Sequence, residues 1–167
     1  MKAKTVVKTI LKILLGIGIA VFSVWLFAML GLIVMFGLPE LDEKLNGHKN
    51  AISRIEHYAD AELPEDIKIE YHYYEDSFQD FSQYTRIKFE CEPTAWLEAN
   101  CFTAGPSEEF ERNFFDYTGD EQRVPTEYRV DFSAKYRWFE RWGENEPATL
   151  FVYFPDTQTL VFCMASF

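Results

Sequence analysis

Hydrophobic and polar residues are distributed in two sharply different ways along this chain. From Ile13 to Leu38, 26 residues pass without a charge, and Pro39 follows. A helix of that length measures about 39 Å, whereas the hydrocarbon core of a bilayer is about 30 Å thick. Because a helix satisfies its own backbone hydrogen bonds in lipid, the pattern predicts one transmembrane helix over residues 13–38.

The next segment, residues 39–63, is predicted to be an amphipathic helical connector. Its apolar residues recur at helical spacing and form one stripe. The stripe consists of Leu41, Leu45, Ile52, Ile55 and Ala59. Gly47 lowers the helix propensity in the middle of the segment, so both one helix and two shorter helices are compatible with the sequence.

Beyond residue 64 the period of the pattern changes to two, which is typical of half-buried strands. In "IKIEYHYY" the residues Ile67, Ile69, Tyr71 and Tyr73 alternate with more polar ones, and this places His72 on the outward face. The stretch "TRIKFECE" alternates in the same way. The two stretches predict an antiparallel hairpin whose strands are joined by the loop "EDSFQDFSQ".

Two short helices are expected after this hairpin. Pro93 suits the first turn of a helix over "PTAWLEANC". Ser107 is a suitable N-cap for a second helix over "SEEFERNFFDY", and acidic residues fill its first turn.

Three further strands are predicted towards the C-terminus. Residues 129–142 alternate cleanly and predict one long strand, with Trp138 on the buried face and Arg137 in solvent. The runs "TLFVYF" and "TLVFCMASF" are almost continuously apolar, which indicates central strands covered on both faces. The fold class is therefore predicted to be α+β. Residues 64–167 should form an acidic domain with an antiparallel sheet of about five strands and helices packed on one face.

Charge sets the expected orientation of the membrane helix. Lys2, Lys4, Lys8 and Lys12 precede the span, and all 27 acidic residues lie at or beyond Glu40. Since Lys and Arg remain on the cytoplasmic side, residues 1–12 are predicted to be a basic cytoplasmic N-terminus. The later residues are expected to be extracytoplasmic, in a single-pass protein of the plasma (inner) membrane. This composition is typical of bacterial envelope proteins.

The apolar segment favours a retained signal-anchor over a cleaved signal peptide. The apolar core of a cleaved signal is only about 7–15 residues long and precedes a small-x-small cleavage site. The uncharged run here is longer, and "VMFGLPE" offers no such site. Cleavage of the N-terminal segment remains the alternative.

The search for chemical motifs is mostly negative. The chain contains no glycine-rich phosphate loop, H-E-x-x-H or C-x-x-C, so no catalytic residue, cofactor or metal site is predicted. Residues 40–167 carry 12 basic and 27 acidic residues, a formal net charge of −15, which repels nucleic acid. The expected partners are the lipid bilayer, through residues 13–38, and a protein or cationic partner outside the cytoplasm. Cys91, Cys101 and Cys163 are odd in number; buried free thiols are favoured, and a disulfide remains open.

Five residues are candidates for ligand binding. Trp138, Glu140 and Trp142 share one parity of the predicted long strand, whereas Phe78 and Phe81 lie in a polar loop. Tryptophan rings can form a platform for sugars, although aromatic residues also dominate protein cores. The sequence favours a membrane-anchored extracytoplasmic binding or scaffolding module of unknown ligand. The alternative is an envelope enzyme, such as a hydrolase, that uses Glu140 as a desolvated acid.

Overall fold

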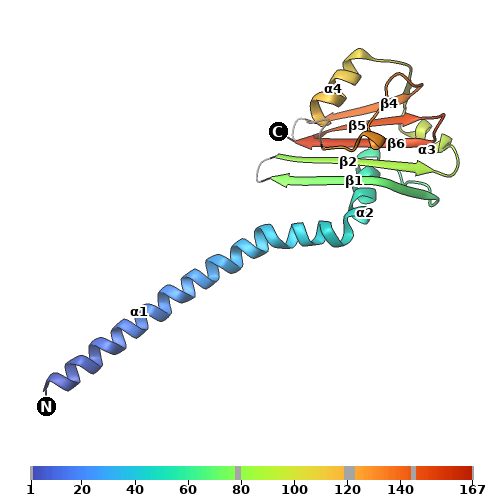
Figure 1. Cartoon of the computed structure of the whole chain (residues 1–167). Coiled ribbons are helices and arrows are strands. Elements are labelled where there is room, and N and C mark those ends of the chain that lie inside the picture. Colours follow the sequence, from blue (N-terminus) through green and yellow to red (C-terminus); the bar gives the residue numbers. More distant parts are fainter. Residues whose placement is uncertain (1, 78–79, 119–122, 144–145, 167) are drawn as a thin grey trace. The chain divides into compact units, whose positions relative to one another are not determined.

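The computed structural model describes residues 2–77, 80–118, 123–143 and 146–166. The chain divides into two compact units, Met1–Leu45 and Asn46–Phe167. The elements follow one another as in Figure 1: α1 (Lys2–Leu32), a π-helical segment η1 (Ile33–Gly37), α2 (Leu38–Ala59), β1 (Ile67–Ser77), β2 (Asp80–Phe89), α3 (Thr94–Ala99), β3 (Thr103–Ala104), α4 (Glu108–Thr118), a 3-10 turn η2 (Thr126–Tyr128), β4 (Arg137–Gly143), β5 (Glu146–Phe154) and β6 (Thr159–Ser166).

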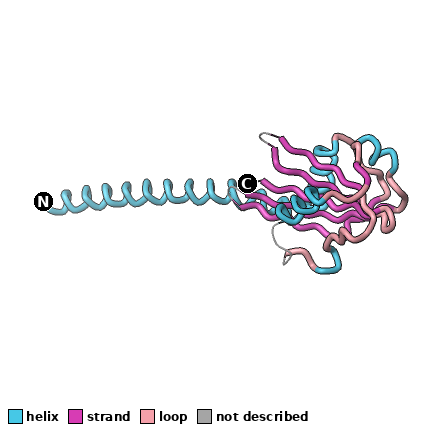
Figure 2. The backbone as a smooth tube through the Cα atoms, turned by 90° about the horizontal axis from the view of Figure 1, so that it is seen from above, coloured by secondary structure: helices cyan, strands magenta, loops and turns pink. Residues whose placement is uncertain are grey.

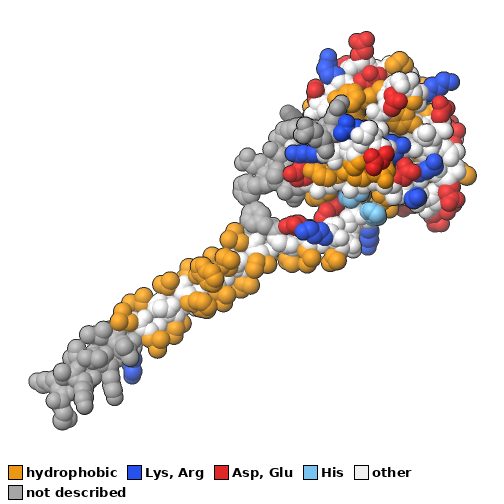
Figure 3. Space-filling model, viewed as in Figure 1, with side chains coloured by type: hydrophobic (Ala, Val, Ile, Leu, Met, Phe, Trp, Pro, Cys, Tyr) orange, Lys and Arg blue, Asp and Glu red, His pale blue; other side chains and the backbone are white. Residues whose placement is uncertain are grey.

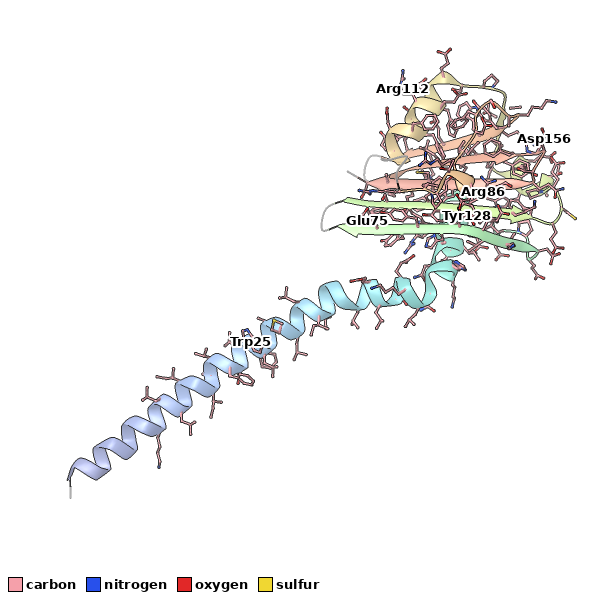
Figure 4. All side chains as sticks on the ribbon, in the orientation of Figure 1. Trp25, Glu75, Arg86, Arg112, Tyr128 and Asp156 are labelled. Atoms are coloured by element: carbon pink, nitrogen blue, oxygen red, sulfur yellow. The ribbon has the colours of Figure 1, made fainter. Side chains whose placement is uncertain are left out.

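The first unit is helical and carries its apolar side chains on the outside. Within α1, the stretch Leu14–Leu32 has a mean hydropathy of 2.3, and none of it is buried. Trp25, for example, is 56% exposed and projects from the helix in Figure 4. Among the described residues this is the one helix long and apolar enough to cross a membrane, a test that a signal sequence also passes.

The helix passes Pro39 by changing its hydrogen-bond pattern rather than by ending. The Leu38 N–H bonds to the Ile33 carbonyl, five residues back, at the end of the π-helical segment. A proline has no N–H to donate, and Pro39 lies in the first turn of α2, where such a donor is not required. Gly47 lies inside α2, which is one helix rather than two.

The second unit contains a six-stranded sheet in which every neighbouring pair is antiparallel. The strand order is β1-β2-β6-β5-β4-β3. Figure 2 shows the strands, in magenta, running beside one another in this sheet. The predicted α+β class is confirmed, with one strand more than expected because the two-residue strand β3 pairs with β4 at the edge. The runs "TLFVYF" and "TLVFCMASF" form β5 and β6, which are central as predicted.

Helices cover both faces of the sheet, not one face as the sequence suggested. On the first face, residues of α2 and α3 pack against Phe151 and Phe162. On the second face, α4 packs against Val161 and Cys163. Alternate residues of β6 therefore enter two different cores, because successive side chains of a strand point to opposite faces. The sequence predicted the α4 helix but not the face of the sheet that it covers.

A β-bulge in β1 overturns the predicted face of three side chains. The register shifts between Ile69 and Tyr71. Such a bulge inserts one extra residue and reverses the parity of everything that follows. Tyr71 and Tyr73 consequently join the α4 side of the sheet rather than the face of Ile69. His72 pairs with Thr85 and is half-buried instead of facing outward.

The hairpin connection predicted over "EDSFQDFSQ" is largely strand. Ser77 pairs with Asp80 and Glu75 with Ser82, so most of that stretch extends β1 and β2. Phe81 is consequently a strand residue, and it is half-buried against the core on the α2 side. The period-two pattern is not visible in this stretch because charged and small residues occupy the ends of β1 and β2.

The long strand predicted over residues 129–142 exists only in its second half, as β4. The Ser133 N–H donates to the Asp131 carboxylate (2.9 Å), and the Ala134 N–H donates to the Asp131 carbonyl (3.3 Å). Hydrogen bonds from the Ser133 side chain and from the Ser133 N–H lower the pKa of the Asp131 carboxyl. An aspartate that bonds its own backbone two residues on makes a turn, and this turn ends the extended conformation before β4 begins.

Two-sided burial of β6 makes Phe162 a sensitive position. Phe162 is fully buried, with its ring centroid 4.8 Å from that of Phe151. Truncation of a buried phenylalanine costs about 3–5 kcal/mol, so Phe162→Ala should lower the midpoint of thermal unfolding strongly. The matched variant Phe115→Ala removes a ring that is 48% exposed, and it should cost about 1 kcal/mol or less. Near-UV circular dichroism of the full chain in mild detergent measures both; equal midpoints would contradict the two-sided core.

Candidate functional site

The three candidate residues of β4 lie together but do not surround a cavity. The Trp138 ring stacks on Phe110 of α4 with a centroid distance of 4.9 Å. Trp142 is 47% exposed, and its ring meets Tyr117 edge-on at 5.1 Å. Glu140 is half-buried, and its Oε2 is buried without a hydrogen-bond partner among the described residues. Trp138 is thus core packing, whereas Trp142 retains an open ring face.

Of the two phenylalanine candidates, Phe81 is not brought to these residues. Phe81 packs on the α2 side of the sheet, opposite the side on which Trp138 and Phe110 pack. Phe78 lies outside the described residues. The four candidates that the structure describes therefore do not form one site.

One cavity among the described residues has a volume of about 520 Å³, and we call it the Arg137 cavity. Its walls come from the loop after β3, the irregular segment before β4 and the turn after β5. The lining residues are Ala104, Gly105, Pro106, Phe132, Ser133, Ala134, Lys135, Tyr136, Arg137 and Pro155. Both charged residues in this set are cations. This volume lies within the range of about 300–1,000 Å³ that is typical of small-molecule binding pockets.

Tyr136 fixes one wall of the Arg137 cavity. Its hydroxyl accepts a hydrogen bond from the Ser107 N–H (2.9 Å) and donates one to Oε1 of Glu111 (2.6 Å). Burial and the Glu111 carboxylate raise the pKa of the Tyr136 phenol to about 12. The wall is therefore tied to the first turns of α4, which Ser107 caps through a 3.2 Å bond to the Phe110 N–H.

Gly105 fixes the opposite wall. Its φ of +97° lies in the left-handed region that side chains rarely adopt. This conformation turns the chain from β3 towards α4. The Gly105 carbonyl accepts a hydrogen bond from the Trp138 indole N–H (3.2 Å), and the Gly105 N–H donates to the Tyr136 carbonyl (3.4 Å). Trp138 thus positions the cavity wall rather than a ligand.

Arg137 is the main departure from the predicted site. It was expected in solvent, but it is half-buried, and its Nε is buried without a hydrogen-bond partner among the described residues. The expectation was wrong because β4 begins at Arg137 and has helices or loops on both sides. The turn-forming Asp131 and Ser133 were the available signal that the preceding segment is irregular.

The second cavity, which we call the Arg54 cavity, has a volume of about 320 Å³ and lies between α2 and the β1–β2 hairpin. It is lined by Ser53, Arg54, His57, Tyr58, Tyr74, Phe81 and Met164. Here the cation is engaged: the Arg54 guanidinium lies 4.2 Å from the centroid of the Tyr74 ring and donates to the buried Gln83 amide oxygen (3.0 Å). This arrangement satisfies buried polar groups and is explained by packing.

Histidines and cysteines offer little further chemistry. Rings of His48 and His72 lie 6.2 Å apart, a proximity that the sequence did not predict. Within the described ranges, no group of three or more His, Cys, Asp or Glu side chains is placed to hold a metal. All three cysteines are free; Cys163 is buried, but Cys91 and Cys101 are exposed, contrary to the favoured expectation.

Comparison with known proteins adds no identification. Neither a family model, nor a curated protein, nor a solved structure matches the chain. The candidate site therefore stands on its own geometry. By volume and by its two cations, the Arg137 cavity is the best candidate for a ligand-binding site.

Loss of the Tyr136 hydroxyl should destabilise the fold. In Tyr136→Phe, the Glu111 oxygen and the Ser107 N–H each lose a partner in a part-buried hydrogen bond, which costs about 1–3 kcal/mol. Tyr128→Phe is the matched control, because the half-buried Tyr128 stacks on Tyr71 through its ring and should lose under about 0.5 kcal/mol. Thermal unfolding of the two variants tests the role of the hydroxyl, and equal midpoints would contradict it.

Alkaline pH should destabilise the domain through its buried phenols. Burial is the main cause that raises the pKa of Tyr136 and Tyr153 to about 12 and that of Tyr84 still further. These phenols are neutral in the folded state, whereas an unfolded tyrosine ionises near pH 10. The contribution of these phenols to the free energy of unfolding should therefore be constant below about pH 10 and fall as the pH rises towards 12. Absorbance of tyrosinate should rise together with unfolding, and ionisation of all nine tyrosines before unfolding would contradict the burial.

Proposed function

We propose that the protein is a single-pass membrane-anchored module that binds a ligand or partner outside the cytoplasm. The observation that carries this proposal is the exposed apolar surface of α1, where none of the stretch Leu14–Leu32 is buried. A continuous apolar surface of this size is costly to hydrate. Insertion of this helix into a lipid bilayer removes the cost of hydrating its apolar side chains.

Charge supports the orientation. The basic residues before the span remain on the cytoplasmic side by the positive-inside rule, and the 27 acidic residues all follow it. Figure 3 shows many Asp and Glu side chains on the visible face of the second unit, with Lys and Arg between them. Such a surface repels nucleic acid and anionic headgroups, and it allows a protein or cationic partner.

Both faces of the sheet are occupied by packed side chains, which favours a binding role over catalysis. Residues of both faces of the sheet are buried against helices. Glu140, the acid of the alternative enzyme function, has one buried oxygen without a partner among the described residues. However, Glu140 lines neither described cavity, so it has no substrate space beside it.

The two exposed cysteines provide a direct test of orientation. A membrane-impermeant maleimide should label Cys91 and Cys101 in intact spheroplasts of a bacterial host, because both thiols are exposed in the second unit. Cys163 is buried, and burial raises the pKa of its thiol to about 12, so it should remain unlabelled.

The double variant Cys91→Ser, Cys101→Ser is the control and should take up no label. The protein should also stay in the membrane pellet after a carbonate wash. Labelling that requires lysis of the spheroplasts would place the second unit in the cytoplasm and contradict the proposal. Release by carbonate would contradict the anchor.

Reversal of the positive flank should disturb insertion. Lys4→Glu together with Lys8→Glu leaves two of the four flanking lysines and adds two acids, so part of the population should insert in the opposite orientation. The same maleimide assay measures this fraction. Unchanged orientation would mean that another property, such as folding of the second unit, decides the topology.

A further inference from the structure

Two histidines from distant parts of the chain meet in the second unit, and we call them the histidine pair. His48 lies in α2 and His72 in β1. Their ring centroids are 6.2 Å apart, and the ring planes are inclined at 81°. His48 is exposed and His72 is half-buried, and Figure 3 shows histidine side chains, in pale blue, at the surface. Neither residue lines the Arg137 cavity or the Arg54 cavity.

The bulge in β1 brings His72 to the α2 side of the sheet. Without the register shift between Ile69 and Tyr71, alternation would place His72 on the face opposite Ile69, which is the α4 side. With the shift, Tyr71 takes the α4 side and His72 the α2 side. Bulges are common beside functional sites, where they redirect a side chain. Here the bulge directs an imidazole towards His48.

A chain of hydrogen bonds orients the ring of His72. Its Nδ1 lies 2.9 Å from the hydroxyl oxygen of Thr85, the residue opposite it in β2. The same oxygen accepts a hydrogen bond from Nε2 of Gln83 (2.9 Å), whose Oε1 accepts one from Arg54 of α2 (3.0 Å). Thr85 and Gln83 are buried, so packing holds this polar chain in place. A histidine that binds a metal typically has its other ring nitrogen engaged in this way, which assigns Nε2 as the metal-binding atom of His72.

The separation of the two rings matches a shared metal ion. With a metal–nitrogen distance of about 2.1 Å, a metal in the plane of an imidazole lies about 3.2 Å from its centroid, so two rings that share one metal have centroids about 5–6.5 Å apart. The observed 6.2 Å lies within this range. The exposed ring of His48 has room to turn towards the ion, which can arrive from solvent.

We propose that His48 and His72 form an open site for a divalent transition metal such as Cu²⁺ or Zn²⁺. One nitrogen of each imidazole binds the ion. Among the described residues, no further His, Cys, Asp or Glu side chain is placed to complete a group of three. Water or an external ligand therefore fills the remaining positions, as in metal sites that stay open. Imidazole suits copper, zinc and nickel, whereas Mg²⁺ and Ca²⁺ select oxygen ligands.

The charge of the domain favours a cation at this site. Residues from Glu40 onward carry 12 basic and 27 acidic residues, a formal net charge of −15, and such a field raises the local concentration of divalent cations. The site goes beyond the proposed function, because it requires neither the membrane anchor nor the Arg137 cavity.

Electron paramagnetic resonance of bound Cu²⁺ tests the site. The parent is the full chain with Cys91→Ser and Cys101→Ser in nanodiscs, because exposed thiols would compete for copper. Equimolar Cu²⁺ should give a bound spectrum with coupling to two imidazole nitrogens. Excess Mg²⁺ should leave this spectrum unchanged, since it does not favour nitrogen ligands.

Three variants of this parent assign the ligands. His48→Ala should fold normally, since His48 is exposed, and should weaken binding at least about tenfold, because loss of even an outer-shell partner costs about 10–100-fold in metal affinity. His72→Gln keeps a polar side chain beside Thr85 and should weaken binding similarly. His57→Ala is the matched control: His57 is an exposed histidine of α2 whose ring lies against Tyr58 at 4.9 Å, and its loss should leave binding unchanged. Thermal unfolding of each variant shows that it is folded.

Three results would overturn the proposal. They are coupling to fewer than two imidazoles in the folded parent, displacement of the copper by Mg²⁺, or equal weakening by His48→Ala and His57→Ala. Maleimide labelling is measured without added metal, so failure of the metal site is distinguishable from failure of the proposed membrane function.

Discussion

Burial of β5 and β6 on both faces is the constraint on which the second unit depends. Phe151 and Phe162 face one core, while Leu150, Val152 and Val161 face the other. Each of these side chains is fully removed from water, and burial of such a side chain contributes about 1.5–3 kcal/mol relative to exposure. Two central strands whose side chains are apolar on both faces must be covered by other elements on both faces. The positions of α2 and α3 on one face and of α4 on the other follow from this requirement.

The sequence predicted those elements whose apolar pattern is unambiguous and missed those decided by a single backbone conformation. Continuous apolar runs identified β5 and β6, and Ser107 marked the start of α4, because these signals are local. The bulge after Ile69 reversed the faces of the rest of β1, and the turn at Asp131 shortened the predicted strand before β4. Period-two alternation cannot reveal either event, because an inserted or turned residue leaves the order of apolar and polar letters unchanged.

The candidate site was harder to predict than the fold, for a different physical reason. The Arg137 cavity is assembled from Gly105, from the irregular segment before β4 and from Pro155, which are distant in sequence and meet only through strand pairing. No local sequence pattern predicts that these segments lie together. Trp138 was named as a candidate for ligand binding and also as a core residue, and it stacks on Phe110 and positions Gly105. Composition identified aromatic residues as important, but tertiary contacts decided which of them pack and which line a space.

The order of strands in the sheet also has a kinetic consequence. β6 is the last of the six strands to be synthesised, yet it lies between β2 and β5 and joins the two halves of the sheet. Until it emerges, β1–β2 and β4–β5 are separate hairpins, and the apolar edge of β5 has no partner. Pairing β2 with β6 also closes a long stretch of chain, which slows folding. The sheet of the nascent domain therefore cannot be completed until β6 has been synthesised, and before then the exposed edge of β5 can be bound by chaperones or can aggregate.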